Sequence, residues 1–384
     1  MCQQPLIAVP YHYSEKDAEN AARIVLSGKL HHDQGQEIIS LEREFAGFVG
    51  AKYALAVNSC TSALSLAFQA IGLRPGDEVI VPAYTFIASA QAVLINGGTP
   101  VFADIDDTFT IDPSRLEHLI TKKTRALMPV HLFGNVANMG AIMKVARKHK
   151  LAVVEDCAQA VGARYDGRDA GTIGDVGCYS FNIKKAIPTG QGGMLVTSDA
   201  KIIARARIAR NTGIETKDQK TDVVSLGGTF FMTELEASLG RSVLRQLEHL
   251  NSTRKQNFEY LISLLEPLRR YVKPYRVLPK VEPSCSRLAF MVDFKALGIS
   301  RRQFLAATQA EGIPVQTFYP TPLYRYSIFR RMRDNLPFVE EFCDKQVGTE
   351  FSPYWSFQDM RDIAQAFSKV LYLLSPNRKN IKLW

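Results

Sequence analysis

The sequence contains no run of about 18 apolar residues, the length that a membrane-spanning helix requires, so we expect no membrane partner. Its first residues, MCQQPLIAVP, place no basic segment before their short apolar patch, and we expect no signal peptide there. There are only six cysteines, and no two of them have the CxxC spacing of a zinc motif. We therefore expect reduced thiols, no bound metal and a cytoplasmic location.

Arginine-rich tracts with interleaved aromatic residues are also absent, which argues against nucleic-acid binding. The chain has 384 residues, of which 46% are apolar and 22% are charged, as in an ordinary globular protein. This composition excludes a disordered, collagen-like or coiled-coil chain. The formal net charge of +9 permits an anionic partner, although basic side chains scattered over a solvated surface would give the same balance.

Short apolar runs alternate with helix-like segments from about Ser14 to Lys201. This rhythm is typical of a mainly parallel sheet with helices on both faces. We expect strands over residues 54–57, 78–81, 100–104, 125–130, 151–154 and 194–197, and helices over residues 62–71, 89–96, 114–120 and 139–149. Ligands of such sheets bind at the carboxyl ends of the strands. Polar segments follow several of these ends, at residues 58–61, 84–86, 156–159 and 180–185.

A long helical region is expected from Thr233 to about Leu268, where apolar residues follow helical spacing. Four prolines then interrupt the chain between residues 267 and 283. A strand is expected next, followed by two helices, over residues 288–294, 301–311 and 360–374. We predict two domains, a large one over residues 1–250 and a smaller C-terminal α+β domain over residues 251–384.

Three residues near the middle of the chain form a pattern that suits pyridoxal phosphate (PLP). Asp156 ends an apolar strand, Gln159 follows three residues later, and Lys185 precedes a glycine-rich stretch. PLP requires a lysine amine for its aldehyde, a carboxylate beside its pyridine nitrogen and a hydrogen-bond donor near its phenolic oxygen. Each residue alone has an ordinary explanation, such as a strand end or a surface lysine. Their combination is what indicates the cofactor.

The other parts of a PLP site can also be found in the sequence. The run from Asn58 to Ser62 directly precedes a helix, whose first amides could hold a phosphate. Ser180 could add a hydroxyl donor, and the aromatic ring of Phe86 could lie against the pyridine face. A plain helix cap and a core aromatic are the alternative explanations.

The whole pattern resembles the sugar aminotransferases of the DegT/StrS type, a family of fold-type I PLP enzymes. The motifs that carry this resemblance occur in the family's order at residues 28–35, 41–46, 58–64, 75–79, 85–86, 104–106, 129–134, 155–160, 171–175 and 180–193. The resemblance implies the α/β fold of PLP-dependent transferases of fold type I. Its large domain would hold a mainly parallel seven-stranded sheet between helices, beside a smaller C-terminal α+β domain.

The resemblance also implies roles for single residues. Lys185 would bind PLP as a Schiff base and move protons during catalysis. Its neighbour Lys184 is a competitor, but the family places this lysine five residues after the serine that corresponds to Ser180. Asp156 would pair with the pyridinium, and Gln159 would contact the phenolic oxygen. The remaining cofactor contacts would come from Cys60 through its backbone and from Thr61, Ser180 and Phe86.

The chain departs from the family pattern at several positions. Cys60 stands where the family has glycine, and Gln191 stands where it has glutamate. Thr229 and Phe231 replace an asparagine and an arginine. The asparagine normally reaches the phosphate in the partner subunit, and Thr229 would be a shorter cofactor-binding substitute for it. Phe318 lies in a segment that lacks the usual histidine. Because the three catalytic candidates are retained, we interpret these changes as altered substrate choice rather than lost activity.

The sequence therefore predicts a PLP-dependent aminotransferase that cycles its cofactor between PLP and pyridoxamine phosphate. The expected donor is L-glutamate, and the expected acceptor is a nucleotide-linked keto-sugar in the biosynthesis of surface polysaccharides or secondary metabolites. We expect a homodimer with shared active sites. One alternative is an aminotransferase for a keto-cyclitol or a keto-sugar without nucleotide, with glutamine as a further donor candidate. Another alternative is a PLP-binding homologue without turnover that acts as a regulator or scaffold.

Overall fold

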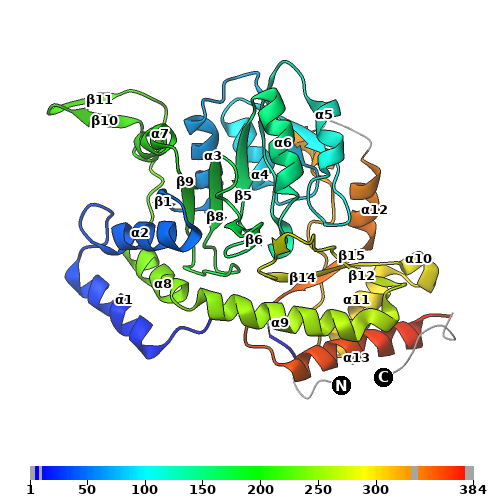
Figure 1. Cartoon of the computed structure of the whole chain (residues 1–384). Coiled ribbons are helices and arrows are strands. Elements are labelled where there is room, and N and C mark those ends of the chain that lie inside the picture. The colour runs from blue at the N-terminus through cyan, green and yellow to red at the C-terminus, as the bar shows by residue number, and fades with distance from the viewer. Residues whose placement is uncertain (1–4, 8–10, 330–335, 377–384) are drawn as a thin grey trace.

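Short apolar segments between residues 53 and 197 form the main sheet of the protein (Figure 1). The computed structural model describes residues 5–7, 11–329 and 336–376. Across the sheet the strands are β1 (Tyr53–Val57), β9 (Gly193–Thr197), β8 (Val176–Ser180), β5 (Ala152–Asp156), β4 (Thr124–Leu127), β2 (Glu78–Pro82) and β3 (Thr99–Ala103).

Strand β9 runs antiparallel to both of its neighbours, β1 and β8, while the pairs from β8 across to β3 are parallel. Every residue of β8 and β9 is buried, as expected for strands that are covered on both faces. The predicted α/β fold with a mainly parallel seven-stranded sheet is confirmed.

Side chains of each strand alternate between two hydrophobic clusters, because successive residues of a strand point to opposite faces. In β1, Leu55 and Val57 join the cluster with helices α3 (Cys60–Ala70), α4 (Ala88–Ile95) and α7 (Ala200–Arg210). Ala54 and Ala56 join the other cluster with helices α2 (Glu37–Val49), α6 (Met139–His149) and α8 (Glu234–Leu244). The sheet is thus the middle layer of three.

Two helical expectations differ from the structure in detail. The segment at residues 114–120 is a 3₁₀ turn (Pro113–Arg115) followed by the short helix α5 (Leu116–Leu119). The long helical region is two helices, α8 and α9 (Leu247–Leu265), which are followed by a second 3₁₀ turn at Glu266–Leu268. Thr233 caps α8 and exchanges hydrogen bonds with Glu236, a capping box that fixes where the helix begins.

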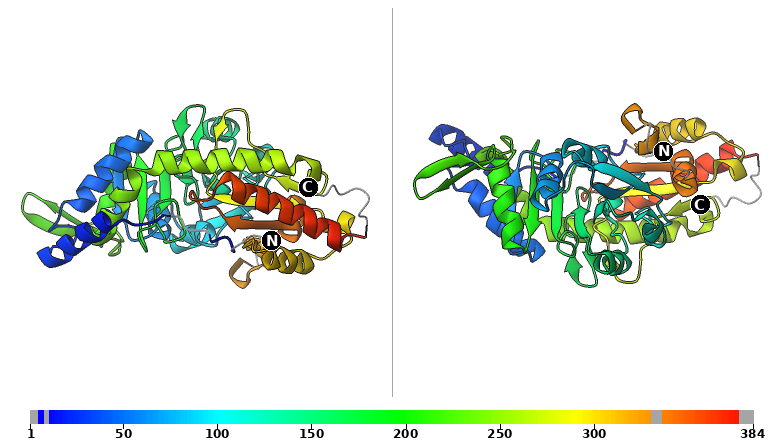
Figure 2. Two further views of the ribbon diagram at one scale, coloured as in Figure 1. Left: turned by 90° about the horizontal axis from the view of Figure 1, so that it is seen from below. Right: turned by 90° about the horizontal axis from the view of Figure 1, so that it is seen from above.

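A second, antiparallel sheet follows in the C-terminal part of the chain. Its strands are β12 (Val272–Pro274), β14 (Arg287–Val292) and β15 (Gln346–Glu350), with β14 in the middle. Helices α10 (Phe294–Leu297), α11 (Arg301–Ala310), α12 (Pro337–Lys345) and α13 (Phe357–Leu374) accompany this sheet, and α13 lies beside α9 (Figures 1 and 2).

Helix α9 continues across residue 250, so the predicted domain boundary falls inside a helix. The start of the chain is also tied to the C-terminal part. The amide of Leu6 donates to the carbonyl of Gly312, and the indole nitrogen of Trp355 donates to the carbonyl of Ile7. The division into residues 1–250 and 251–384 stays a prediction.

Smaller elements lie outside the two sheets. Helix α1 (Glu15–Ser27) and the hairpin of β10 (Ile214–Lys217) and β11 (Lys220–Val223) extend from the same end of the molecule (Figures 1 and 2). A short three-stranded sheet combines β13 (Val281–Glu282), β6 (Arg164–Tyr165) and β7 (Arg168–Asp169).

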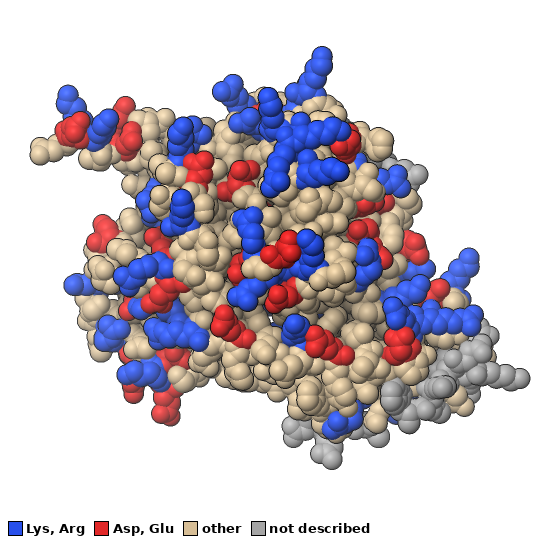
Figure 3. Space-filling view, in the orientation of Figure 1, with Lys and Arg blue, Asp and Glu red and all other residues tan. Residues whose placement is uncertain are grey.

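The surface is mixed in charge. On the face shown in Figure 3, basic side chains are interspersed with acidic ones, as on an ordinary solvated surface. The five cysteines in the described ranges are all buried and free. Among the helices that the structure describes, none combines the length and the apolar character needed to cross a bilayer.

Candidate functional site

A cavity of about 530 Å³ opens where the carboxyl ends of β1, β2, β5 and β8 meet. Residues after these strand ends form one wall, and residues of β14, β15 and the segment 316–319 form the other. The predicted site residues that line the cavity are Cys60, Thr61, Phe86, Asp156, Gln159, Ser180 and Lys185. The fold therefore brings these seven residues together in one cavity, and their roles in binding a cofactor and in catalysis stay predictions.

Asp156 is the buried acid of the cavity, with 4% of its surface exposed. Its carboxylate accepts hydrogen bonds from the Ser89 hydroxyl at 2.8 Å and from the Ala158 amide at 3.0 Å. Burial raises the pKa of the Asp156 carboxyl, and the two hydrogen bonds and the nearby Lys185 oppose that shift. Ser89 stands 3.0 Å from the Thr85 hydroxyl, so α4 and the loop before it fix the carboxylate in place.

Gln159 presents its amide nitrogen to the cavity. The side-chain oxygen accepts from the amide of Phe133 at 2.9 Å, which fixes the orientation of the amide group. The nitrogen donates to the hydroxyl of Tyr319 at 3.0 Å. Gln159 can therefore act as a hydrogen-bond donor in the cavity.

Lys185 is half-buried, whereas its neighbour Lys184 is exposed. Burial, and next repulsion from Arg287, lower the pKa of the Lys185 amine to about 8. A substantial share of this amine is neutral near pH 8, and a neutral amine can act as a nucleophile or a base. These properties favour Lys185 over Lys184 as the reactive lysine.

The pKa of Lys185 predicts a pH dependence. We expect acetylation of Lys185 in cofactor-free protein to accelerate with pH and to reach half its maximal rate near pH 8, because the neutral amine is the reactive form. The unfolded chain keeps this proton up to a pKa of 10.5, so Lys185 also makes the free energy of unfolding rise between about pH 8 and 10.5. Mass spectrometry of timed samples measures the rate, and a midpoint near pH 10 would contradict the prediction.

The N-terminus of α3 faces the same cavity. The hydroxyl of Ser59 caps the helix by accepting from the amide of Ser62 at 3.1 Å. Cys60 and Thr61 begin the helix and line the cavity, and amides of a first turn have no acceptor within their helix. Ser180, at the end of β8, adds a buried hydroxyl. Together these donors suit an anion.

Gly193, the first residue of β9, packs against this helix start. A Cβ at Gly193 would lie 2.5 Å from the carbonyl carbon of Ser59 and 2.6 Å from the nitrogen of Cys60. Those distances are too short for any real side chain, so only glycine allows this approach of the backbone. This requirement explains one glycine of the glycine-rich stretch after Lys185.

We expect Gly193→Ala to lower the free energy of unfolding by roughly 2 kcal/mol, as overpacking does. Gly47→Ala is the matched control: Gly47 lies within α2, its added Cβ would meet nothing within 4 Å, and the change should stabilise the helix by roughly 0.5–1 kcal/mol. Urea unfolding of both variants measures the difference. Equal effects of the two substitutions would contradict the packing argument.

Phe86 and Thr229 differ in where the structure places them. Phe86 lines the cavity with 55% of its surface exposed, and its ring centroid lies 6.1 Å from that of Tyr319. Thr229 does not line the cavity; it is exposed and forms an isolated β-bridge with Asn211. Within its own chain, Thr229 therefore does not contribute to the site.

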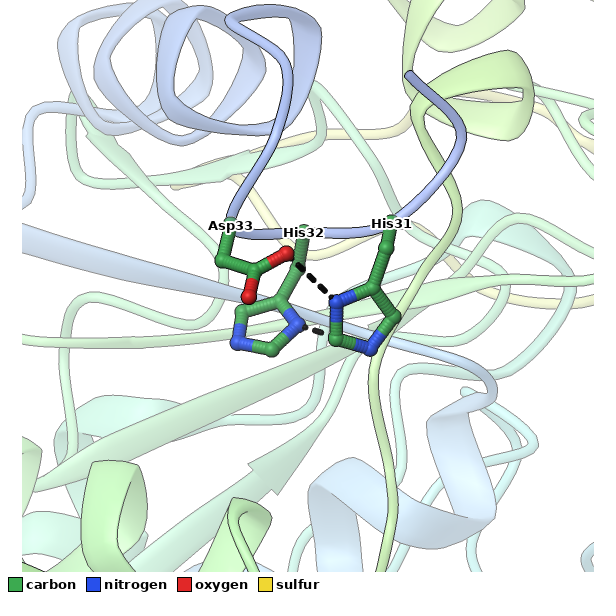
Figure 4. Close-up of side chains that lie close together, drawn as sticks. All are labelled: His31, His32 and Asp33. Atoms are coloured by element: carbon green, nitrogen blue, oxygen red, sulfur yellow. Dashed lines mark hydrogen bonds and ion pairs between the residues drawn. The ribbon is translucent and has the colours of Figure 1, made fainter. Parts of the chain in front are cut away.

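Phe231 contacts the loop between α1 and α2. In this loop His31, His32 and Asp33 lie close together (Figure 4). The ring of His32 stacks on Phe231 at a centroid distance of 3.5 Å. His31 uses Nδ1 to bond Asp33 at 2.7 Å, and its Nε2 lies 3.2 Å from Nδ1 of His32. Arg210 lies over the same Phe231 ring at 4.9 Å. Phe231 thus packs outside the cavity that holds Lys185.

Glu155 explains why three of the sequence motifs belong together. This buried carboxylate accepts from the amides of Gly171, Ile173 and Gly174 at 2.6–2.9 Å. It also lies 2.9 Å from Nε2 of His131. The motifs at residues 129–134, 155–160 and 171–175 therefore meet behind Asp156, at the end of β5.

Four further residues of the site were not identified from the sequence: Ser89, Arg287, Tyr319 and Glu350. Arg287 and Glu350 face each other across β14 and β15 and are joined by two hydrogen bonds of 2.8 and 2.7 Å. Tyr319 accepts a hydrogen bond from Gln159, and its backbone φ is +43°, a conformation that residues other than glycine rarely adopt. Strained residues of this kind cluster at functional sites.

Comparisons with a family model, with known sequences and with solved structures all lead to aminotransferases. The family model of the DegT/DnrJ/EryC1/StrS aminotransferase family matches residues 12–368. A GDP-perosamine synthase of Caulobacter vibrioides is 42% identical over 246 residues, which cover 64% of this chain and 66% of that protein. A UDP-N-acetyl-3-dehydro-alpha-D-glucosamine 3-aminotransferase of Acidithiobacillus ferrooxidans is 35% identical over 377 residues, covering 96% and 98% of the two chains. The solved aminotransferase of Psychrobacter cryohalolentis superposes with a TM-score of 0.90 at 29% identity, covering 96% of this chain and 99% of that one.

Proposed function

The chain belongs to the DegT/DnrJ/EryC1/StrS aminotransferase family, and we propose from this premise that it transfers an amino group from L-glutamate to a nucleotide-linked keto-sugar with the help of PLP. The observation that carries the proposal is the composition of one cavity. It combines the half-buried amine of Lys185, the buried carboxylate of Asp156 and the N-terminus of α3.

The side chains and amides of the cavity fit PLP in chemical type. The start of α3, with Thr61 and Ser180, offers amide and hydroxyl donors for a phosphate. Asp156 offers a carboxylate for the pyridine nitrogen, and the amide nitrogen of Gln159 offers a donor for the phenolic oxygen. The remaining group, the amine of Lys185, would be the attachment point of the cofactor.

When bound, PLP supplies an aldehyde that accepts amines and a ring that withdraws electrons from the carbon beside the amine. The chain's own groups do the rest. Lys185, whose pKa is about 8, can hold or release a proton at the reacting carbon near neutral pH. The carboxylate of Asp156 would hold a proton on the ring nitrogen of the bound cofactor, and that positive charge would in turn favour the charged form of the buried acid.

A nucleotide-linked sugar is the acceptor that the relatives favour. The two relatives described above are named for GDP- and UDP-linked sugars. The positive net charge of +9 is compatible with a diphosphate, which is anionic.

We propose a homodimer with shared active sites. Exposed apolar side chains gather on α1, α2 and the segment after β11, where Leu26 and Leu226 are each 87% exposed and Ile39 is 52% exposed. Thr229 would serve the site of the partner subunit, since it stays outside the cavity of its own chain. Light scattering of the purified protein tests this assembly, and a fully active monomer would contradict it. The cytoplasmic location stays a prediction.

An absorbance spectrum of the purified protein with PLP tests the function directly. We expect a visible band from the attached cofactor, its loss on addition of L-glutamate, and its return when a nucleotide-linked keto-sugar is added. Loss of the band with L-glutamate and no recovery with any keto-sugar would overturn the proposed acceptor. Absence of a band would overturn the proposed use of PLP.

A further inference from the structure

Arg287 is the only arginine among the described residues that line the 530 Å³ cavity. Its side chain is 8% exposed, so the guanidinium is held in a largely dehydrated place. It is close enough to Lys185 to contribute to the lowered pKa of that amine. Phe231, where the family pattern has an arginine, lies outside this cavity and packs on His32. The cavity thus has a guanidinium, but it comes from Arg287 on β14 and not from the position of Phe231, where the family pattern has its arginine.

Glu350 occupies only one edge of this guanidinium. Its carboxylate accepts from Nε at 2.8 Å and from Nη2 at 2.7 Å. The ring of Phe318 lies 4.7 Å from the guanidinium carbon and supports its flat face. The side chain of Arg287 is therefore fixed in orientation before any ligand binds.

The other edge of the guanidinium remains for a second acceptor. A guanidinium carries five N–H groups, and the pair with Glu350 uses two of them. Nη1 makes only a long contact of 3.4 Å to the hydroxyl of Tyr319. Two neighbouring N–H groups in one plane match the two oxygens of a carboxylate.

Tyr319 provides a further donor beside this edge. Its hydroxyl oxygen already accepts from Gln159 at 3.0 Å and from Arg287 at 3.4 Å. Burial raises the pKa of Tyr319, so the hydroxyl keeps its hydrogen at neutral pH. That hydrogen is left to donate to an acceptor in the cavity.

A smaller cavity of about 130 Å³ shares Lys184, Lys185, Arg287 and Glu350 with the larger one. Arg254 is a further lining residue of this smaller space, and only 2% of it is exposed. Apart from Lys185, whose amine would carry the cofactor, its walls have three basic side chains against one carboxylate. Such a charge balance favours a ligand with more than one negative charge.

We propose that Arg287, assisted by the hydroxyl of Tyr319, binds a carboxylate of the amino-acid donor and selects an acidic amino acid. This inference rests on the proposed transamination, because it assigns the donor subsite of the same cavity. No covalent step is involved: the carboxylate takes the free edge of the guanidinium while Glu350 keeps the other edge.

Glutarate is the probe for a direct binding test, because it has two carboxylates and no amine to react. Calorimetry on the PLP-loaded protein should show glutarate binding that weakens about 10- to 100-fold in Arg287→Gln, the loss expected for a charge-assisted hydrogen bond. Arg287→Lys should recover part of the affinity, because lysine restores the positive charge but not the two parallel N–H groups of the guanidinium. Arg276→Gln is the matched control, since Arg276 pairs in the same way with Asp107 on the surface and should leave binding unchanged.

A second variant protects the test against misfolding. Arg287→Gln alone leaves Glu350 without its partner, so Arg287→Gln/Glu350→Gln replaces the ion pair by two neutral amides. In this double variant the KM for L-glutamate should rise about 10- to 100-fold, while the KM for the keto-sugar changes less than about threefold. Folded protein with unchanged glutarate binding and unchanged KM for L-glutamate would overturn the assignment of Arg287.

Donor comparison separates this inference from the proposed function. If L-glutamate, L-glutamine and L-alanine all lose affinity in the variant, Arg287 binds the α-carboxylate; if L-glutamate alone does, it binds the side-chain carboxylate. Both results support the binding of a donor carboxylate by Arg287, but only the second supports the selection of an acidic amino acid, which the first would overturn. A wild-type preference for L-glutamine would overturn the acidic donor. The wild type could also bind glutarate through Arg287 and yet transfer no amino group. This result would support the assignment of Arg287 and overturn the proposed function.

Discussion

Lys185→Ala is expected to lower kcat for amino transfer by about 10⁴-fold, because it removes both the attachment point of the cofactor and the group that moves the proton. The amine lies in the cavity with the carboxylate of Asp156, and its pKa of about 8 suits proton transfer near neutral pH. Steady-state rates with L-glutamate and a nucleotide-linked keto-sugar measure the loss.

Lys184→Ala is the matched control, since it removes the exposed lysine next to Lys185. This control should keep its kcat within about threefold of the wild type, because Lys184 lines the cavity as an exposed charge and its loss should act on substrate binding, which KM reports, rather than on proton transfer. The variant Lys185→Ala should also keep or raise the thermal midpoint of the cofactor-free protein, because burial disfavours the charged amine. A similar loss of activity in both variants would mean that the reactive lysine has been assigned wrongly.

Asp156→Asn is expected to have the next largest effect, a loss of roughly 10²–10⁴-fold in kcat, comparable to removal of an acid–base group. Asparagine keeps the size of the side chain, and its single carbonyl oxygen can still accept from the Ala158 amide while its NH2 group donates to the Ser89 hydroxyl. It cannot provide the negative charge that holds a proton on a ring nitrogen. The loss should therefore appear in kcat rather than in the fold, as measured by steady-state kinetics and thermal unfolding.

Asp199→Asn provides a comparison at a site where the charge is not needed. Asp199 caps α7 by accepting from the amides of Lys201 and Ile202, and asparagine caps helices as well as aspartate does. This variant should keep full activity. The buried carboxyl of Asp156 has a raised pKa, so its neutral replacement should not lower the thermal midpoint. Full activity of Asp156→Asn would show that the charge of Asp156 is not used.

The main sheet could be predicted because its strands are short, apolar and separated by turn residues and amphipathic helices. The direction of β9 could not be predicted in this way. A buried strand has the same apolar composition whether it is parallel or antiparallel, and the pairing of β9 with β1 joins residues about 140 positions apart.

The candidate residues Asp156, Gln159, Ser180 and Lys185 could be found because they lie within 30 residues of one another and end neighbouring strands. Ser89 could not be found, because its bond to Asp156 depends on how α4 packs over the sheet. The polar run from Asn58 to Ser62 before a helix suggested the anion site, but the close approach of Gly193 to Ser59 arises from tertiary packing and could not be predicted.

The second wall of the cavity lay beyond sequence reasoning for a similar reason. Arg287 and Glu350 are separated by 63 positions, and only the register of β14 and β15 brings them face to face. Tyr319 belongs to a segment in which the loss of a histidine was noticed, yet its backbone conformation and its bond to Gln159 arise from tertiary packing.

Leu6 and Ile7 are translated about 300 residues before their partners in the C-terminal part of the chain. Leu6 bonds to Gly312, and Ile7 accepts from Trp355, 348 positions later. All seven strands of the main sheet lie within residues 53–197, so this sheet can assemble while the rest of the chain is still being made. The segment of Leu6 and Ile7 must therefore wait until Gly312 and Trp355 have been translated, and its docking follows the assembly of the main sheet.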